Sequence, residues 1–63
     1  MPHHIVIAST ATFNKTIAGT VNGEPRRITL LNERTLRIEP DIVCWIASAI
    51  AQDGQTVIYA INK

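Results

Sequence analysis

The chain has 63 residues, of which 46% are hydrophobic and 17% charged, and its formal net charge is +1. So short a chain cannot hold two cores, and we expect a single domain spanning residues 1–63. The small net charge gives no global field that would favour nucleic acid or an anionic membrane. A single cysteine excludes an internal disulfide, so close packing or oligomerisation must stabilise the domain.

The sequence has no features of a membrane span or of a secretory signal. No apolar run reaches the ~18 residues that a crossing helix requires. The first four residues lack the basic start and cleavage pattern of a signal peptide. A lone Cys44 is typical of a reducing compartment. We therefore expect a cytoplasmic protein with no membrane partner.

The first half of the chain contains three predicted strands. Residues 5–8 are a short apolar, β-branched run, which predicts a buried strand. Asn22 and Gly23 tolerate the positive φ that a two-residue type I′ turn requires at both central positions. They therefore predict a hairpin that sets Ile17 opposite Ile28. The second face of this hairpin is mostly polar and suits contact with water.

The next strand is predicted over residues 35–39, where apolar and polar side chains alternate. A three-residue loop pairs Leu30 with Leu36 and Ile28 with Ile38, whereas a two-residue loop would place Leu36 opposite a threonine. We therefore favour the three-residue loop. A helix over residues 30–38 is the alternative, because Leu, Glu and Arg are good helix formers.

Residues 40–53 predict a helix. Pro40 suits the first helical turn, Asp41 suits the positive end of the helix dipole, and Gly54 can end the helix in the left-handed conformation. Side chains placed at helical intervals form an apolar arc of roughly 240°, which is more than one sheet can cover. We therefore expect part of this helix to pack against a second copy of the chain.

The last predicted strand covers residues 56–61 and is apolar on both faces, which indicates a central or interface strand. The predicted order is therefore β-β-β-β-α-β. This order indicates an α+β fold in which a small antiparallel sheet of four to five strands packs one helix on a face.

Catalytic and cofactor motifs are missing from the sequence. A strand, a turn and a helix cap explain the three glycines, Gly19, Gly23 and Gly54, and neither a nucleophile elbow nor a phosphate loop occurs. Cys44 lies within the predicted apolar helix, which favours a structural role over a nucleophilic one. We therefore expect no enzymatic activity and no cofactor.

Histidines His3 and His4 have no spaced histidine or cysteine partners that would complete a metal site. Removal of Met1 would place His4 third in the chain, an arrangement that can bind Cu(II) or Ni(II). We favour solvated or weakly packed histidines and expect no metal.

A modestly basic surface is predicted on the polar side of the sheet. Arg27 and Arg37 should project from one face among threonine hydroxyls, with Arg26 and Arg34 near its rims. Glutamates lie close by and no aromatic residue interleaves with the arginines. These features favour an ordinary solvated face, with phosphate contact as the alternative.

We expect a non-enzymatic protein-interaction module. The predicted form is a homodimer that acts as an inhibitor or accessory protein of the kind that bacteria and phages encode. Its partner or subunit interface should comprise Trp45, Ala47, Ala51 and Tyr59, since Trp is enriched among interface hot spots. The alternative function is a weakly basic nucleic-acid-binding or regulatory protein that uses the four arginines.

Overall fold

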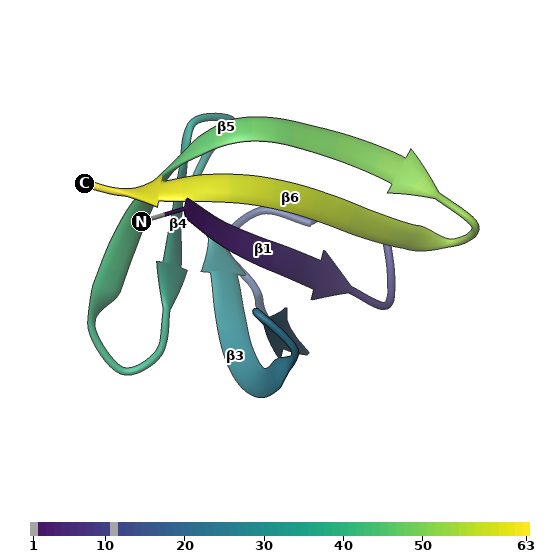
Figure 1. The fold of residues 1–63 in the computed structure, drawn as a ribbon, viewed down its shortest axis with the longest axis horizontal. Coiled ribbons are helices and arrows are strands. Elements are labelled where there is room, and N and C mark those ends of the chain that lie inside the picture. The colour runs from purple at the N-terminus through teal and green to yellow at the C-terminus, as the bar shows by residue number, and fades with distance from the viewer. Residues whose placement is uncertain (1, 11) are drawn as a thin grey trace.

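The computed structural model describes residues 2–10 and 12–63, and these residues contain strands and no helix. Each strand pairs antiparallel with the next along the chain, and pairing of the first with the last closes the sheet into a barrel (Figure 1). The strands are β1 (Pro2–Ile7), β2 (Thr16–Val21), β3 (Glu24–Leu30), β4 (Thr35–Ile38), β5 (Ile42–Gln52) and β6 (Gln55–Asn62). The predicted α+β fold is therefore wrong.

The predicted helix over residues 40–53 is the source of this error. Most of the segment is β5, which pairs with β4 from Ile42 to Trp45 and with β6 from Cys44 to Gln52. Pro40 lies in the turn between β4 and β5, after a cis peptide bond. Isoleucine and valine recur in the segment, and β-branched residues pack well on a pleated surface. Ladders with β4 over the first part of β5 and with β6 over the rest stabilise the extended form.

Asp53 and Gly54 form the turn between β5 and β6 rather than a helix end. Their φ angles are 52° and 76°. Positive values at both central positions are those of a type I′ hairpin turn, for which Asp-Gly is a preferred sequence. Gly54 has the left-handed conformation expected of it, but in a hairpin.

The predicted pairings in the first half of the chain are confirmed. Ile17 lies opposite Ile28 across the Asn22-Gly23 turn. Leu30 lies opposite Leu36, and Ile28 opposite Ile38, as the three-residue loop requires. The alternative helix over residues 30–38 is excluded by these pairings.

The first and last predicted strands are also present. Residues 5–8 correspond to β1, which begins earlier, at Pro2, and ends at Ile7. Residues 56–61 lie within β6, which has β1 on one side and β5 on the other. β6 therefore has strand neighbours on both sides, as its apolar residues indicated.

The interior of the barrel is filled by alternate residues of every strand. Ten buried apolar side chains form the core: Ile5, Ile7, Val21, Ile28, Leu30, Leu36, Ile38, Cys44, Ile58 and Ala60. A Cβ atom added at Gly19 would lie 2.6 Å from the carbonyl oxygen of Val6 and 3.1 Å from Cδ1 of Ile28. Glycine at this position therefore allows β2 to approach β1 closely.

β5 contains a bulge at Ala47, where its pairing with β6 shifts between Ile46 and Ser48. Cys44 points into the barrel before the bulge, and Ala49, opposite the buried Ile58, faces the same side after it. Because the bulge inserts one extra residue, the inward-facing residues of β5 are even-numbered before it and odd-numbered after it. Residues 47–52, which we call distal β5, continue with β6 beyond the last pair with β4 (Figure 1).

We predict that Gly19→Ala lowers the free energy of unfolding by about 1–3 kcal/mol, because the added methyl group meets backbone and core atoms. Urea denaturation followed by circular dichroism measures the change. Ala18→Ser is the matched control, since it adds a similarly small group at an exposed position next to Gly19 on β2. If Gly19→Ala were as stable as the control, β1 and β2 could not be packed this closely.

Candidate interaction surface

The outer side of β5, β6 and β1 is a continuous and mostly apolar surface. Residues directly opposite each other on antiparallel strands share a face. Three cross-strand rows therefore lie side by side on the outside of the barrel: Trp45 with Ile61 and Pro2, Ser48 with Tyr59 and His4, and Ile50 with Val57 and Val6. We call these nine residues the outer face.

Four large side chains of the outer face are exposed to solvent. The exposed fractions are 56% for Ile50, 48% for Tyr59, 45% for Ile61 and 42% for Trp45. Not one of the nine residues is a lysine, arginine, aspartate or glutamate. A patch that lacks charge and contains Trp and Tyr has the composition of the centre of a protein interface.

Two contacts hold the aromatic side chains of the outer face in place. Nζ of Lys63 lies 4.6 Å from the centroid of the Trp45 ring, within cation–π range. The ring centroids of His4 and Tyr59 are 5.2 Å apart, with the rings tilted relative to each other. Side chains that are already positioned lose less conformational entropy when a partner binds.

The predicted interface residues divide between two places. Trp45 and Tyr59 come together on the outer face, on adjacent strands. Ala47 lies at the bulge, and Ala51 stands opposite the buried Thr56 on the other side of the sheet. The prediction missed Ile50, Ile61 and the residues of β1. The period-two alternation of a strand over residues 42–52 would have identified Ile50.

The predicted basic surface is divided as well. Arg27 and Arg37 lie on the outer side of β3 and β4, and Thr29 is opposite Arg37. Arg26 lies on the opposite face of β3 from Arg27, because successive residues of a strand alternate between its faces. Its Nη2 donates a hydrogen bond of 2.8 Å to the carbonyl oxygen of Glu39. The structure therefore brings together only two of the four arginines, on the outer side of the barrel.

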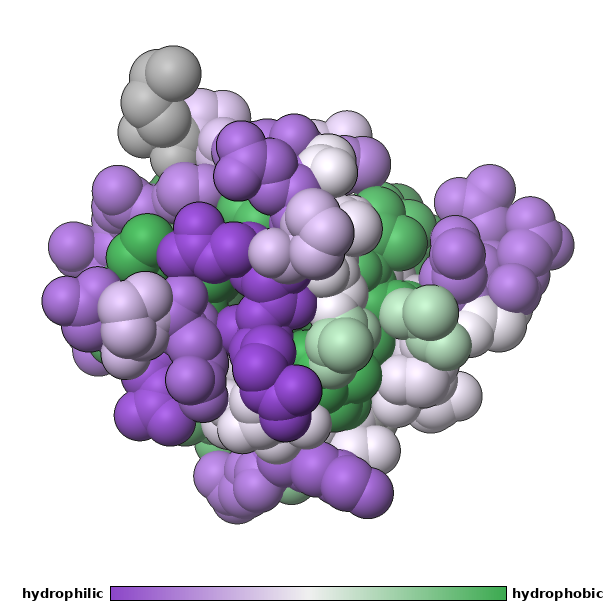
Figure 2. All heavy atoms as spheres, turned by 90° about the horizontal axis from the view of Figure 1, so that it is seen from below, coloured by the Kyte–Doolittle hydropathy of each residue, from purple (hydrophilic) through white to green (hydrophobic). Residues whose placement is uncertain are grey.

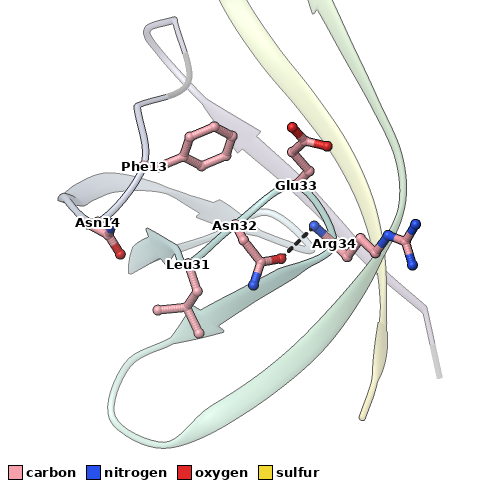
Figure 3. Close-up of a pocket in the computed structure, with 6 residues that line it drawn as sticks. All are labelled: Phe13, Asn14, Leu31, Asn32, Glu33 and Arg34. Atoms are coloured by element: carbon pink, nitrogen blue, oxygen red, sulfur yellow. Dashed lines mark hydrogen bonds between the residues drawn. The ribbon is translucent and has the colours of Figure 1, made fainter.

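Arg34 lines a different feature, an open hollow of about 540 Å³ at one end of the barrel (Figure 3). Its floor and rim come from residues 13–14 and 31–34. Oδ1 of Asn32 accepts hydrogen bonds from the backbone N–H groups of Arg34 and Thr35, at 2.8 and 3.0 Å, and fixes this loop. The Phe13 ring and the Glu33 carboxylate lie on one side, whereas the Arg34 side chain extends away from both.

The described residues contain no group of three or more His, Cys, Asp or Glu side chains that could hold a metal ion. Cys44 is fully buried, and its Sγ lies 3.7 Å from Oδ1 of Asn62, which also bonds Nε2 of His3 at 2.6 Å. Burial raises the pKa of the Cys44 thiol, which keeps it protonated. Residues 2–10 and 12–63 include no helix capable of spanning a membrane.

Comparison with known proteins finds no match to this chain among protein-family models, curated proteins or solved structures. The function of the chain must therefore be inferred from its own side chains and their geometry.

We predict that Cys44 of the folded protein reacts with a thiol reagent at about pH 8 at least a hundredfold more slowly than in urea. The reaction requires both opening of the barrel and loss of a proton from a thiol whose pKa is raised. Absorbance of the released chromophore gives the rate, and Cys44→Ala gives the background. Rapid modification of the folded protein would contradict the position of Cys44 in the core.

Proposed function

We propose that this protein is a non-enzymatic module that binds another protein through its outer face. The observation that carries the proposal is the group of nine uncharged residues among which Trp45, Tyr59, Ile50 and Ile61 are exposed together, with Lys63 at its border. Removing these side chains from water favours association.

A protein fits the outer face better than a nucleic acid does. Phosphate contacts require lysine, arginine or polar donors spread along the binding path. The polar groups of the nine side chains are limited to those of Ser48, Tyr59 and His4 and the indole N–H of Trp45. Aliphatic residues such as Ile50 and Val57 gain little from stacking on bases, but they pack well against apolar side chains of a protein.

Trp45 and Tyr59 are the expected hot spots of the contact. Truncation of such residues at the centre of an interface typically costs about 2 kcal/mol or more. A small chain that works by covering a partner's surface suits the expected role of an inhibitor or accessory protein. Self-association is one form of the same proposal, because a second copy of the chain also offers a complementary apolar surface.

We predict that a double variant with Trp45→Ala and Tyr59→Ser loses binding of the partner and keeps the fold, since both side chains point outward. The test uses immobilised protein to capture a partner from a bacterial lysate at high salt, with the retained protein quantified. The matched control is Arg27→Glu, which alters the barrel exterior on β3, away from the outer face. Equal retention by wild type and the outer-face variant would contradict the proposal.

A second candidate function, single-stranded nucleic-acid binding, is favoured by one specific observation. The pairing of β4 with β5 places Arg37 opposite Val43, next to the Thr35 and Trp45 pair. Lys63 lies over the Trp45 ring. An exposed aromatic ring beside cationic side chains can stack with a base while the cations contact phosphates. This arrangement was not expected from the sequence, which showed no aromatic residue among the arginines.

For this second candidate, the expected result is binding of a fluorescent single-stranded oligonucleotide that weakens steeply with added salt. Arg37→Glu should reduce the affinity by about tenfold or more, since it both removes a phosphate contact and adds repulsion. Fluorescence anisotropy measures both effects, and Asp53→Asn, in the β5–β6 turn at the far end of β5 from Trp45, is the control. Binding that is independent of salt, or undetectable, would exclude this candidate while leaving the protein-binding proposal intact.

A further inference from the structure

Among the residues that the structure describes, distal β5 has one edge without a strand partner. β4 pairs with β5 only as far as Trp45, and the last bond on that side joins the N–H of Ile46 to the carbonyl oxygen of Arg34 at 2.7 Å. From residue 47 to Gln52 the only strand partner among the described residues is β6. In Figure 1, no strand runs along the outer margin of β5 near the hairpin end. The six residues of distal β5 therefore present one edge that no described strand covers.

The backbone groups along this edge are predictable from the hairpin. In a two-residue hairpin, the pair next to the turn, here Gln52 with Gln55, exchanges hydrogen bonds within the hairpin. Alternation then directs the N–H and C=O groups of Ala51 and Ala49 away from β6 and toward the free edge. These unpaired donors and acceptors form a template for another strand.

Distal β5 carries few of the devices that normally protect an edge strand. It contains no lysine, arginine, carboxylate or proline, and three of its six residues are alanines that expose the backbone. The bulge at Ala47 disturbs only the beginning of the segment. All six residues are exposed. The edge is therefore both accessible and uncharged.

The loops near the edge leave space beside it. A cavity of about 210 Å³ lies on the inner side of distal β5, between Ala49 and the Phe13 side chain. Its wall includes Leu30, Ile46 and Ile58, and also Asn32 and Glu33 of the loop between β3 and β4. Figure 2 shows hydrophobic side chains exposed beside the hydrophilic end of the molecule at the right of the view. Among the residues that the structure describes, Phe13, Asn32 and Glu33 of the loops line this cavity beside Ala49, and all six residues of distal β5 remain exposed.

We propose that a second copy of this chain pairs with this edge, so that two distal β5 segments run antiparallel about a two-fold axis at Ile50. With this centre, Ala49 of each copy faces Ala51 of the other. The outward-directed N–H and C=O groups then meet in hydrogen-bonded pairs. Ile50 of one copy lies opposite Ile50 of the other on the outer side of the sheet.

Charge and symmetry favour a second copy as the occupant. The axis at Ile50 sets Asp53 of one copy opposite Ala47 of the other, so the two aspartates do not face each other. An identical edge on both partners satisfies the self-complementarity of a two-fold contact. The segment is short, and its pairing alone buries less than the roughly 800 Å² per partner of a standard interface. The dimer should therefore be weak and dependent on concentration.

Edge pairing goes beyond the proposed function, because it uses backbone groups of distal β5 rather than the aromatic side chains of the outer face. It also extends that function, since pairing of the two edges joins the two sheets and brings their outer faces together. A dimer of this kind leaves Trp45 and Tyr59 of both copies free for a partner.

The first test is disulfide cross-linking of Ile50→Cys. Directly opposite residues in a non-hydrogen-bonded antiparallel pair have Cα atoms about 4.5 Å apart, within the range for a disulfide. We expect mild oxidation to give a covalent dimer in high yield from Ile50→Cys but not from Gln52→Cys, which would face Ser48 of the other copy. Cys44 is buried in both proteins. Equal cross-linking of the two variants would overturn the two-fold axis at Ile50.

Sedimentation velocity over a concentration series gives the second test. Ala51→Pro removes only an N–H that faces the free edge, and Ala51→Lys adds a charge there, so both should keep the barrel and lose the dimer. Ala18→Lys, the same change at an exposed alanine of β2, should still dimerise. A wild type that is monomeric at all concentrations overturns the proposal. Dissociation by Trp45→Ala with Tyr59→Ser, but not by the Ala51 changes, would instead place the contact on the outer face.

Discussion

The pairing of β1 with β6 is the constraint on which the rest of the structure depends. Six residue pairs, from Pro2 with Ile61 to Ile7 with Thr56, join the two ends of the chain. Without this ladder the sheet would have two long edges and an open apolar side. With it, a chain of 63 residues encloses ten buried apolar side chains without a disulfide. Closure is how so small a domain obtains a core.

Closure of the barrel also removes the need for a second subunit to cover the core. The accessible surface of 4137 Å² is close to the roughly 4,000 Å² that the size scaling gives for a compact monomer of 6.9 kDa. The barrel therefore does not need a partner in order to bury its core. Any dimer must arise from local features, namely exposed side chains or unpaired backbone groups, rather than from a general lack of burial.

The sequence predicted the parts of the fold that local chemistry determines. The Asn22-Gly23 turn and the alternation of Leu36 and Ile38 specify two hairpins, because a turn of known length fixes the register of its strands. The segment of β5 was misassigned because its signals are ambiguous. Alanine favours helices, and Asp53-Gly54 can follow a helix or connect two strands. Hydrogen bonding to β4 and β6 decides between helix and strand for this segment, and those bonds form only when the chain folds.

The same ambiguity limited prediction of the site. Trp45 and Tyr59 were identified by residue type, since large aromatic residues are common at interfaces. Their neighbours on the outer face could not be identified, because residues that share a face differ between a helix and a strand. A helix places Trp45 near Ala49, whereas β5 and β6 place it opposite Ile61. The grouping of Arg37 with Trp45 likewise depends on pairing between two strands.

The bulge at Ala47 connects the two candidate surfaces of the molecule. By inserting one residue, it keeps Trp45 and Ile50 on the same side of β5, although they are an odd number of positions apart. If the same residues formed a regular ladder with no bulge, Ile50 would point toward the interior side and Ala49 outward. The outer face would then lose one of its exposed apolar side chains. The one irregularity in β5 thus extends the apolar exterior along distal β5, at the segment where β4 has ended and the strand edge is free.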